Sequence, residues 1–87
     1  MTNKDLVKIF KAIGNERRFL ILKNLSNKGE LSVGQISEII NLSFKSVSRH
    51  LSILYGADLI KVKQVNINRF YSINEPGFPA QILRLLR

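Results

Sequence analysis

Apolar residues recur with a helical period along the first third of the chain. The first apolar stripe consists of Leu6, Ile9, Phe10 and Ile13. This spacing predicts an amphipathic helix over residues 3–13, which Gly14 ends. A second helix is predicted to follow, with Asn15 as its N-cap and Gly29 as its C-terminal breaker, because asparagine caps helix N-termini and glycine ends helices.

The next two predicted helices are joined by a short turn. Ser32 and Gln35 form the pattern of a capping box, which predicts a third helix that ends near Asn41. Ser43 is the predicted N-cap of a fourth helix. The buried stripe of this helix is predicted to consist of Phe44, Val47, Leu51 and Leu54. Two helices joined in this way predict a helix-turn-helix over residues 33–57.

The hydrophobic period changes from helical to alternating after Asp58. Residues 60–65 alternate apolar and polar side chains and predict a strand, and residues 69–73 predict a second one. The residues between them, Asn-Ile-Asn at 66–68, predict a turn, since asparagine tolerates the left-handed backbone of tight turns. A hairpin directly after a helix-turn-helix is a wing, predicted here over residues 59–73.

A last helix is predicted over residues 78–87, after the break at Glu75-Pro76-Gly77. A chain of 87 residues with 45% hydrophobic content suits one compact domain over residues 1–87. The predicted fold is mainly α-helical with a β-hairpin wing: four helices, the hairpin and a fifth helix, in a dimeric winged helix-turn-helix.

Charge and composition narrow the class of partner. The chain contains fourteen Lys and Arg residues and six Asp and Glu residues, which gives a net charge of +8. This charge favours a polyanionic binding partner, nucleic acid above all, over the alternative that the charge only confers solubility. There is no cysteine, which excludes disulfides and thiolate metal sites. The apolar runs are far shorter than the roughly 20 residues that span a bilayer. Without a signal-peptide pattern, we expect a cytoplasmic protein that does not enter a membrane.

The fourth helix carries the candidate reading face. Lys45, Ser48, Arg49 and Ser52 lie opposite its buried stripe, and residues 43–57 contain no acidic residue. Arginine pairs bidentately with guanine and serine allows close approach, so this face suits a major groove; an ordinary solvated helix face is the alternative. The predicted DNA-binding residues of this helix are Ser43, Lys45, Ser46, Ser48, Arg49, His50 and Ser52. For His50, packing against the core and a phosphate contact remain equally open.

The hairpin and the two end helices carry further candidate contacts. The wing is predicted to contact the DNA backbone or minor groove. The alternative is a solvated sheet edge, whose lysines only prevent it from pairing with a strand of another molecule. Its predicted DNA-binding residues are Lys61, Lys63, Asn66, Asn68 and Arg69. The end helices are apolar beyond the needs of a small core and predict a homodimer interface, with completion of the protomer's own core as the alternative. The predicted interface residues are Leu6, Ile9, Phe10, Ile82, Leu83, Leu85 and Leu86.

Three local motifs, in their order and spacing, resemble the ArsR-type repressors over nearly the whole chain. They are the stretch Ile13-Gly14-Asn15-Glu16-Arg17-Arg18, the stretch Val47-Ser48-Arg49-His50-Leu51-Ser52-Ile53-Leu54 and the stretch Phe70-Tyr71-Ser72-Ile73. The resemblance implies a homodimeric repressor that binds an imperfect inverted repeat and is released by an inducer. Ser32, Gly34, Gln81 and Arg84 stand where metal-sensing members carry ligands, so no metal and no cofactor is expected.

The function predicted is sequence-specific binding of double-stranded DNA by a transcription regulator, as a homodimer on an inverted repeat. A winged-helix module for protein interaction, without specific DNA binding, is the alternative, because a fold does not fix a function. RNA binding stays open, although exposed aromatic residues for base stacking are few. No enzyme is expected, because there is one histidine, no cysteine and no pair of carboxylates with suitable spacing.

Overall fold

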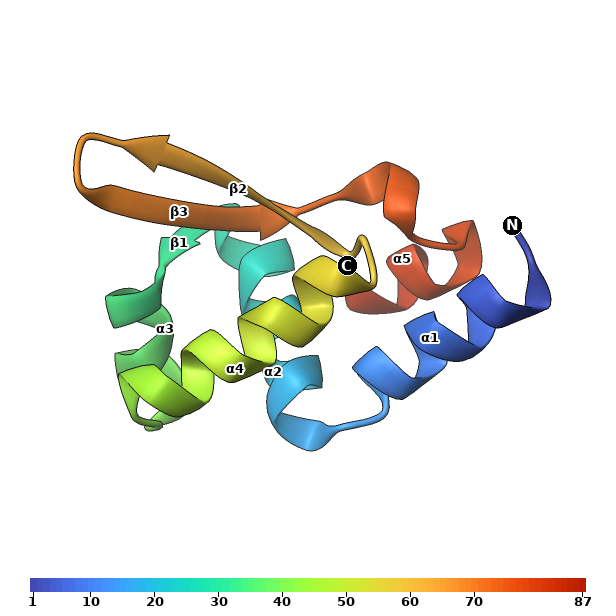
Figure 1. Ribbon diagram of the computed structural model, residues 1–87, viewed down its shortest axis with the longest axis horizontal. Helices are drawn as coiled ribbons and strands as arrows, with labels where there is room; N and C mark the ends of the chain where they lie inside the picture. The colour runs from blue at the N-terminus through green and yellow to red at the C-terminus, as the bar shows by residue number, and fades with distance from the viewer.

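The computed structural model describes residues 1–87 and contains five α-helices, a short 3-10 helix and one antiparallel sheet (Figure 1). In chain order the elements are α1 (Asn3–Ile13), α2 (Glu16–Lys28), β1 (Glu30–Ser32), α3 (Val33–Ile40), α4 (Phe44–Gly56), β2 (Ile60–Val65), β3 (Asn68–Ile73), η1 (Glu75–Gly77) and α5 (Ala80–Leu86). The winged helix-turn-helix predicted from the sequence is confirmed.

Helices α2, α3 and α4 begin directly after their predicted capping residues. The side-chain oxygen of Asn15 accepts the backbone N–H of Arg18 at 3.1 Å, which starts α2. Ser32 and Gln35 exchange hydrogen bonds in a capping box at the start of α3. Asn41 ends α3 in the left-handed conformation, with φ +55°. These local contacts satisfy helix-end groups that would otherwise lack partners, so the sequence alone locates the starts of α2 and α3 and the end of α3.

The sheet has three strands, one more than the alternating pattern predicts. β3 lies in the middle and pairs antiparallel with β1 and β2 (order β1-β3-β2). β1 has three residues, too short a stretch for an alternating pattern to be recognised. The turn is also tighter than predicted: Val65 pairs with Asn68, so Asn68 belongs to β3 and the turn is Asn66-Ile67, with Asn66 at φ +57°.

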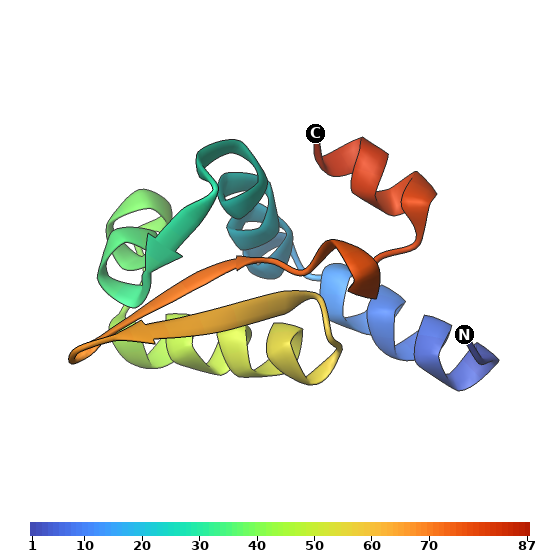
Figure 2. The same ribbon diagram turned by 90° about the horizontal axis from the view of Figure 1, so that it is seen from above.

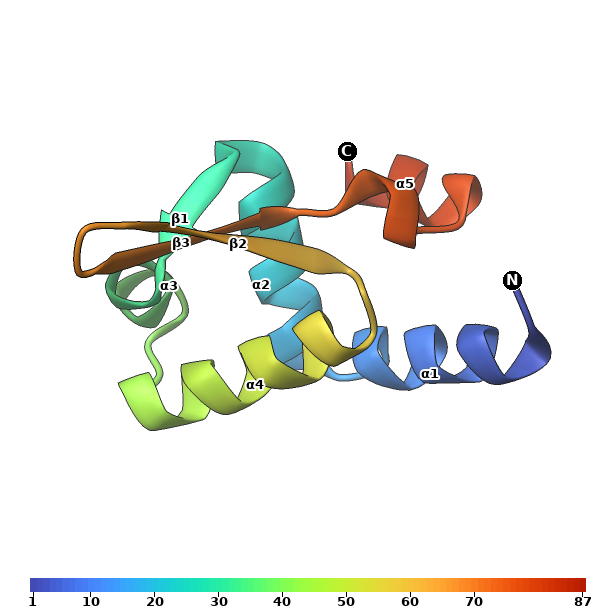
Figure 3. The ribbon, with the colours of Figure 1, turned by 45° about the horizontal axis from the view of Figure 1, so that its top comes forward.

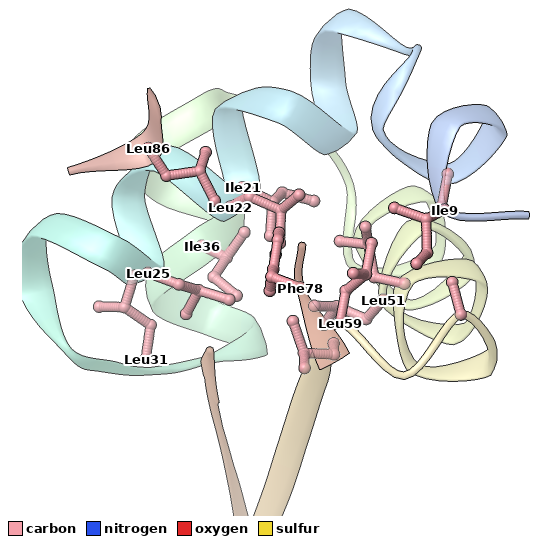
Figure 4. Packing of buried hydrophobic residues seen from close by; sticks show 14 of the residues in the cluster. Ile9, Ile21, Leu22, Leu25, Leu31, Ile36, Leu51, Leu59, Phe78 and Leu86 are labelled. Carbon is pink, nitrogen blue, oxygen red and sulfur yellow. The ribbon is translucent and has the colours of Figure 1, made fainter. Parts of the chain in front are cut away.

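The last helix begins later than predicted, at Ala80 in place of residue 78. Phe78 is extended (φ −101°, ψ 140°) because it precedes Pro79, and a residue before proline is disfavoured in the helical region. Phe78 thus lies outside the helix, and its side chain is buried in the core. Figure 4 shows its ring among Ile21, Leu22 and Leu59.

A single cluster of 15 buried apolar residues holds the helices to the sheet. Three of its members come from α2 and three from α4, and no polar side chain is buried with them. The wing projects at one end of the long axis, beyond the start of α4, whereas α1 and α5 lie together at the other end (Figures 1 and 3). α4 runs alongside the hairpin when the molecule is seen from above (Figure 2). No helix is long and apolar enough to cross a bilayer.

Candidate nucleic-acid interface

The outward face of α4 is basic. Lys45, Ser48, Arg49 and Ser52 are exposed, while Val47, Leu51 and Leu54 of the same helix are buried. No acidic residue lies between positions 43 and 57. The helix therefore presents two cations and small hydroxyl groups to solvent, in the arrangement that the spacing predicts.

Two of the serines predicted to contact DNA are engaged within the first turn of α4. Ser43 Oγ accepts the backbone N–H of Ser46 at 3.2 Å, and Ser43 Oγ lies 3.1 Å from Ser46 Oγ. These bonds cap the helix. Both hydroxyl groups thus have a structural partner before any ligand arrives.

His50 contacts α2. Arg18 Nη1 lies 3.3 Å from His50 Nδ1. The same guanidinium donates from Nε to the carbonyl of Ala12 at 2.7 Å and from Nη2 to the carbonyl of Lys11 at 3.3 Å. Arg18 therefore joins the C-terminal end of α1 to the middle of α4.

The environment of His50 favours its neutral form. Burial lowers the pKa of this imidazole, and the positive charges of Arg18, Arg17 and Arg49 lower it further. A neutral ring leaves Nδ1 free to accept a hydrogen bond from Arg18. Of the two roles that the sequence leaves open for His50, the structure contains the internal contact; a phosphate contact stays a prediction.

The wing has two different faces. Alternate residues of a strand point to opposite sides, and Val62 and Gln64 lie on the side that faces α4. Lys61 and Lys63 therefore lie on the side turned away from α4, and Lys63 Nζ lies 3.2 Å from Glu30 Oε2. The sequence predicts these lysines as DNA contacts, but only Arg69 among the basic residues of the wing shares the cleft with α4.

A cleft of about 460 Å³ separates α4 from the wing. Its lining residues are Leu51, Ser52, Tyr55, Gly56, Val62, Gln64, Arg69 and Tyr71. Sequence reasoning missed Tyr55 and Gln64 because their proximity to Arg69 depends on how the hairpin folds over α4. The strand alternation, which puts Gln64 on the same face as Val62, is the one signal that indicated part of this surface.

Phe44 departs from the prediction. The helical wheel places it at the border of the buried stripe, yet its side chain is 63% exposed. As the first residue of α4 it lies beyond the core, which begins one turn later at Val47. The prediction that Phe44 is buried is therefore wrong.

The opposite end of the molecule is apolar. A hollow of about 280 Å³ lies between α1, the start of α2 and α5, and its lining residues are Phe10, Ile13, Gly14, Phe19, Ile82, Leu85 and Leu86. Phe10 is 58% exposed and Leu85 is 75% exposed. Leu6, Ile82 and Leu83 are half-buried. Of the residues predicted at the dimer contact, the lining of this hollow includes Phe10, Ile82, Leu85 and Leu86.

Two of the predicted interface residues belong to the protomer's own core. Ile9 is buried, and Leu86 is only 1% exposed. α5 is held in place from within, since Lys23 Nζ donates to the carbonyl of Leu86 at 2.9 Å. Ile9 and Leu86 therefore leave almost no surface of their own for a second subunit, and their place at a dimer contact stays a prediction.

No three His, Cys, Asp or Glu side chains gather in a way that could hold a metal ion. The titratable groups of the surface are mostly cations, and the ion pairs are few: Lys63 with Glu30, and Arg87 with Glu75 at 2.6 Å.

Comparison with known proteins gives a consistent result. The family model described as "Bacterial regulatory protein, arsR family" matches residues 15–62. The transcriptional repressor SdpR of Bacillus subtilis is 38% identical over 66 residues, which cover 76% of this chain and 72% of SdpR. The transcriptional activator HlyU of Vibrio cholerae is 36% identical over 81 residues, which cover 93% of this chain and 74% of HlyU.

Solved structures agree with the sequence matches. HlyU from Vibrio cholerae superposes with a TM-score of 0.82 at 30% identity, covering 99% of this chain and 90% of HlyU. The homodimeric winged helix-turn-helix DNA-binding domain of a possible ArsR-family regulator from Mycobacterium bovis superposes with a TM-score of 0.83 at 25% identity. That match covers 95% of this chain and 75% of the other.

Proposed function

We propose that this chain, which belongs to the ArsR family of bacterial regulatory proteins, is a homodimeric repressor that reads an inverted repeat through α4. Its family consists of DNA-binding transcription regulators and not of enzymes. The observation that carries the proposal is the acid-free, exposed basic face of α4, opposite three buried apolar residues. Promoter occlusion by the bound dimer would account for repression.

Specificity in this proposal comes from α4. A helix fits the major groove, and its outward side chains meet the base edges. Arg49 is proposed to pair bidentately with guanine, while Lys45 contacts guanine or phosphate. Ser48 and Ser52 are small enough to let the helix approach the bases closely. One or two such pairs suffice, since each discriminates by about 1–3 kcal/mol.

Sequence-independent affinity in this proposal comes from the other cations and from the wing. Arg69, with Asn66 and Asn68 near the wing tip, is proposed to lie along the DNA backbone or in the minor groove. Lys61 and Lys63 add to the positive field from the outer face of the sheet. Because phosphate binding releases counterions, the affinity falls as the salt concentration rises.

The partner subunit is proposed to be a second copy of this chain, held at the apolar end. Phe10, Phe19 and Leu85 expose enough apolar surface there to favour burial against an equivalent surface. Because that end lies away from the wing (Figure 1), a two-fold dimer would carry a wing at each outer end. Two copies of α4 would then enter successive major grooves about one DNA turn, roughly 34–36 Å, apart.

Selection of bound duplexes from a random DNA pool tests this function, and an inverted repeat is the expected product. With the selected duplex and a scrambled one, Arg49→Ala should lower specific affinity about tenfold or more and non-specific affinity far less. Arg84→Ala on α5 removes the same charge at the opposite end and serves as the control. Equal losses on both duplexes would contradict the role given to Arg49.

A further inference from the structure

One exposed aromatic side chain lies within the basic reading surface. Phe44 is the first residue of α4 and is 63% exposed. It directly precedes Lys45 and lies one turn before Ser48 in α4. An exposed phenyl ring costs free energy in water, so this position favours a partner that covers it.

The ring of Phe44 lies near Gly34 of α3. A Cβ placed on Gly34, near the start of α3, would lie 3.4 Å from Phe44 Cζ. The tip of the ring therefore lies close to the start of α3. One side of the ring is therefore supported by the protein, and the rest of its surface faces solvent.

The position of Phe44 matches that of a base-contacting residue. In helix-turn-helix proteins, the N-terminal residues of the second helix contact base edges in the major groove. The one apolar group that base pairs display in that groove is the C5-methyl group of thymine, and phenylalanine is among the side chains that contact it. The neighbouring cations Lys45 and Arg49 would hold the helix in the groove at this point.

Resting on the DNA-binding function proposed above, we propose that Phe44 packs against the C5-methyl group of a thymine in each half-site and so selects thymine at that position. A second protein surface is a poorer occupant, because the surroundings of Phe44 are cationic. The apolar hollow is lined mainly by residues of α1 and α5. These two helices lie at the end of the molecule away from the start of α4 (Figure 3).

Replacement of single thymines by deoxyuridine tests the proposal, since it removes one methyl group and leaves the base pairing intact. On the selected duplex, one thymine position per half-site should be sensitive. Its replacement should weaken binding of the wild-type chain about fourfold, the change expected from losing burial of one methyl-sized group. Phe44→Ala should bind the thymine and the deoxyuridine duplexes equally well.

Ile53→Ala is the matched control, because Ile53 is also exposed on α4, at 42%, but on the side facing α1. This variant should keep the full sensitivity to deoxyuridine. If the wild-type chain tolerates deoxyuridine at every thymine, or if Phe44→Ala stays sensitive, the proposal is wrong. Failure of the random pool to yield any preferred duplex would instead overturn the function on which it rests.

Discussion

The wing end of the molecule exposes Lys45, Arg49 and Arg69, whereas the end formed by α1 and α5 exposes Phe10, Phe19 and Leu85. Both ends are built from amphipathic helices that bury one stripe in the same core. The difference lies in what remains outside. Water solvates the cations of α4 at no cost, but it solvates the apolar residues of α1 and α5 poorly. The first surface is stable alone and attracts a polyanion, and the second favours association.

The largest effect is expected at Leu85, which is 75% exposed and lines the apolar hollow. Leu85→Glu should give a folded monomer, because it places a charge where the second subunit would pack. Loss of the second half-site should weaken binding to an inverted repeat about 100-fold or more. Sedimentation velocity and a DNA titration measure both effects.

Gln81→Glu is the control for Leu85, since it adds the same charge in the first turn of α5 without lining the hollow. A dimer of unchanged stability in Leu85→Glu would show that the apolar end is not the subunit contact.

A smaller but different effect is expected one residue later, at Leu86. This side chain is 1% exposed within the protomer's core. Leu86→Ala should lower the free energy of unfolding by about 2–5 kcal/mol, through lost burial and a cavity. Urea denaturation at a fixed protein concentration measures it, since dimerisation makes stability depend on concentration. Loss of the dimer without loss of stability would reverse the roles given to Leu85 and Leu86.

The two faces of the wing provide a third test, with an effect of a few-fold. Arg69→Ala should lower DNA affinity and reduce the slope of log affinity against log salt by about 1, as expected for one phosphate contact. Lys63→Ala should change the slope less, because Lys63 lies on the outer face and is paired with Glu30 at 3.2 Å. DNA titrations at several salt concentrations measure the slope for each variant. Equal slopes for Arg69→Ala and Lys63→Ala would contradict the assignment of Arg69 to the face of the wing toward α4 and of Lys63 to the outer face.

The smallest effect concerns pH. Burial, and then the charges of nearby arginines, lower the pKa of His50 below its usual 6.5. As the pH falls through 6.5, His50 is protonated in the unfolded chain before it is protonated in the folded chain. The free energy of unfolding should therefore decrease until the pH has passed the lowered pKa of the folded chain. Well above pH 6.5, His50 is neutral in both states and does not change the free energy of unfolding. His50→Gln should lose less stability than the wild-type chain between neutral pH and about pH 5.

Urea midpoints at a series of pH values measure this difference. Hydrogen bonds from the backbone and side chain of Thr2 lower the pKa of Asp5 from its usual 3.8. Titration of Asp5 therefore changes stability at a lower pH than titration of His50, and the two effects can be separated. Parallel pH profiles for the two chains would contradict the role of His50.

The sequence predicts those features that depend on neighbouring residues. Asn15, Ser32 and Ser43 act within one helical turn of themselves, so their positions locate the starts of α2, α3 and α4. The buried stripe of α4 follows from its period, apart from Phe44, which lies past the edge of the core. The basic face of α4 is predicted for the same reason, because it is the opposite side of that stripe.

Features that depend on distant residues could not be predicted in this way. β1 exists because its three residues pair with Phe70, Tyr71 and Ser72 some 40 positions later, a separation that no local pattern reports. The two faces of the wing depend on the hairpin lying over α4, which decides that Arg69, and not Lys63, faces the cleft. Leu85 and Leu86 are neighbours of identical type, and only the packing of α5 distinguishes them.

The guanidinium of Arg18 holds the last carbonyls of α1 on one side and the imidazole of His50 on the other. Arg18 thus makes a polar link between helices that otherwise contact one another through apolar side chains. Hydrogen bonds depend on direction, so this link resists relative movement of the helices more than apolar contacts do. A shift of the end of α1 would therefore be transmitted to the middle of α4. In the homodimer proposed above, this contact would link the way in which two protomers meet to the depth at which each α4 enters its half-site.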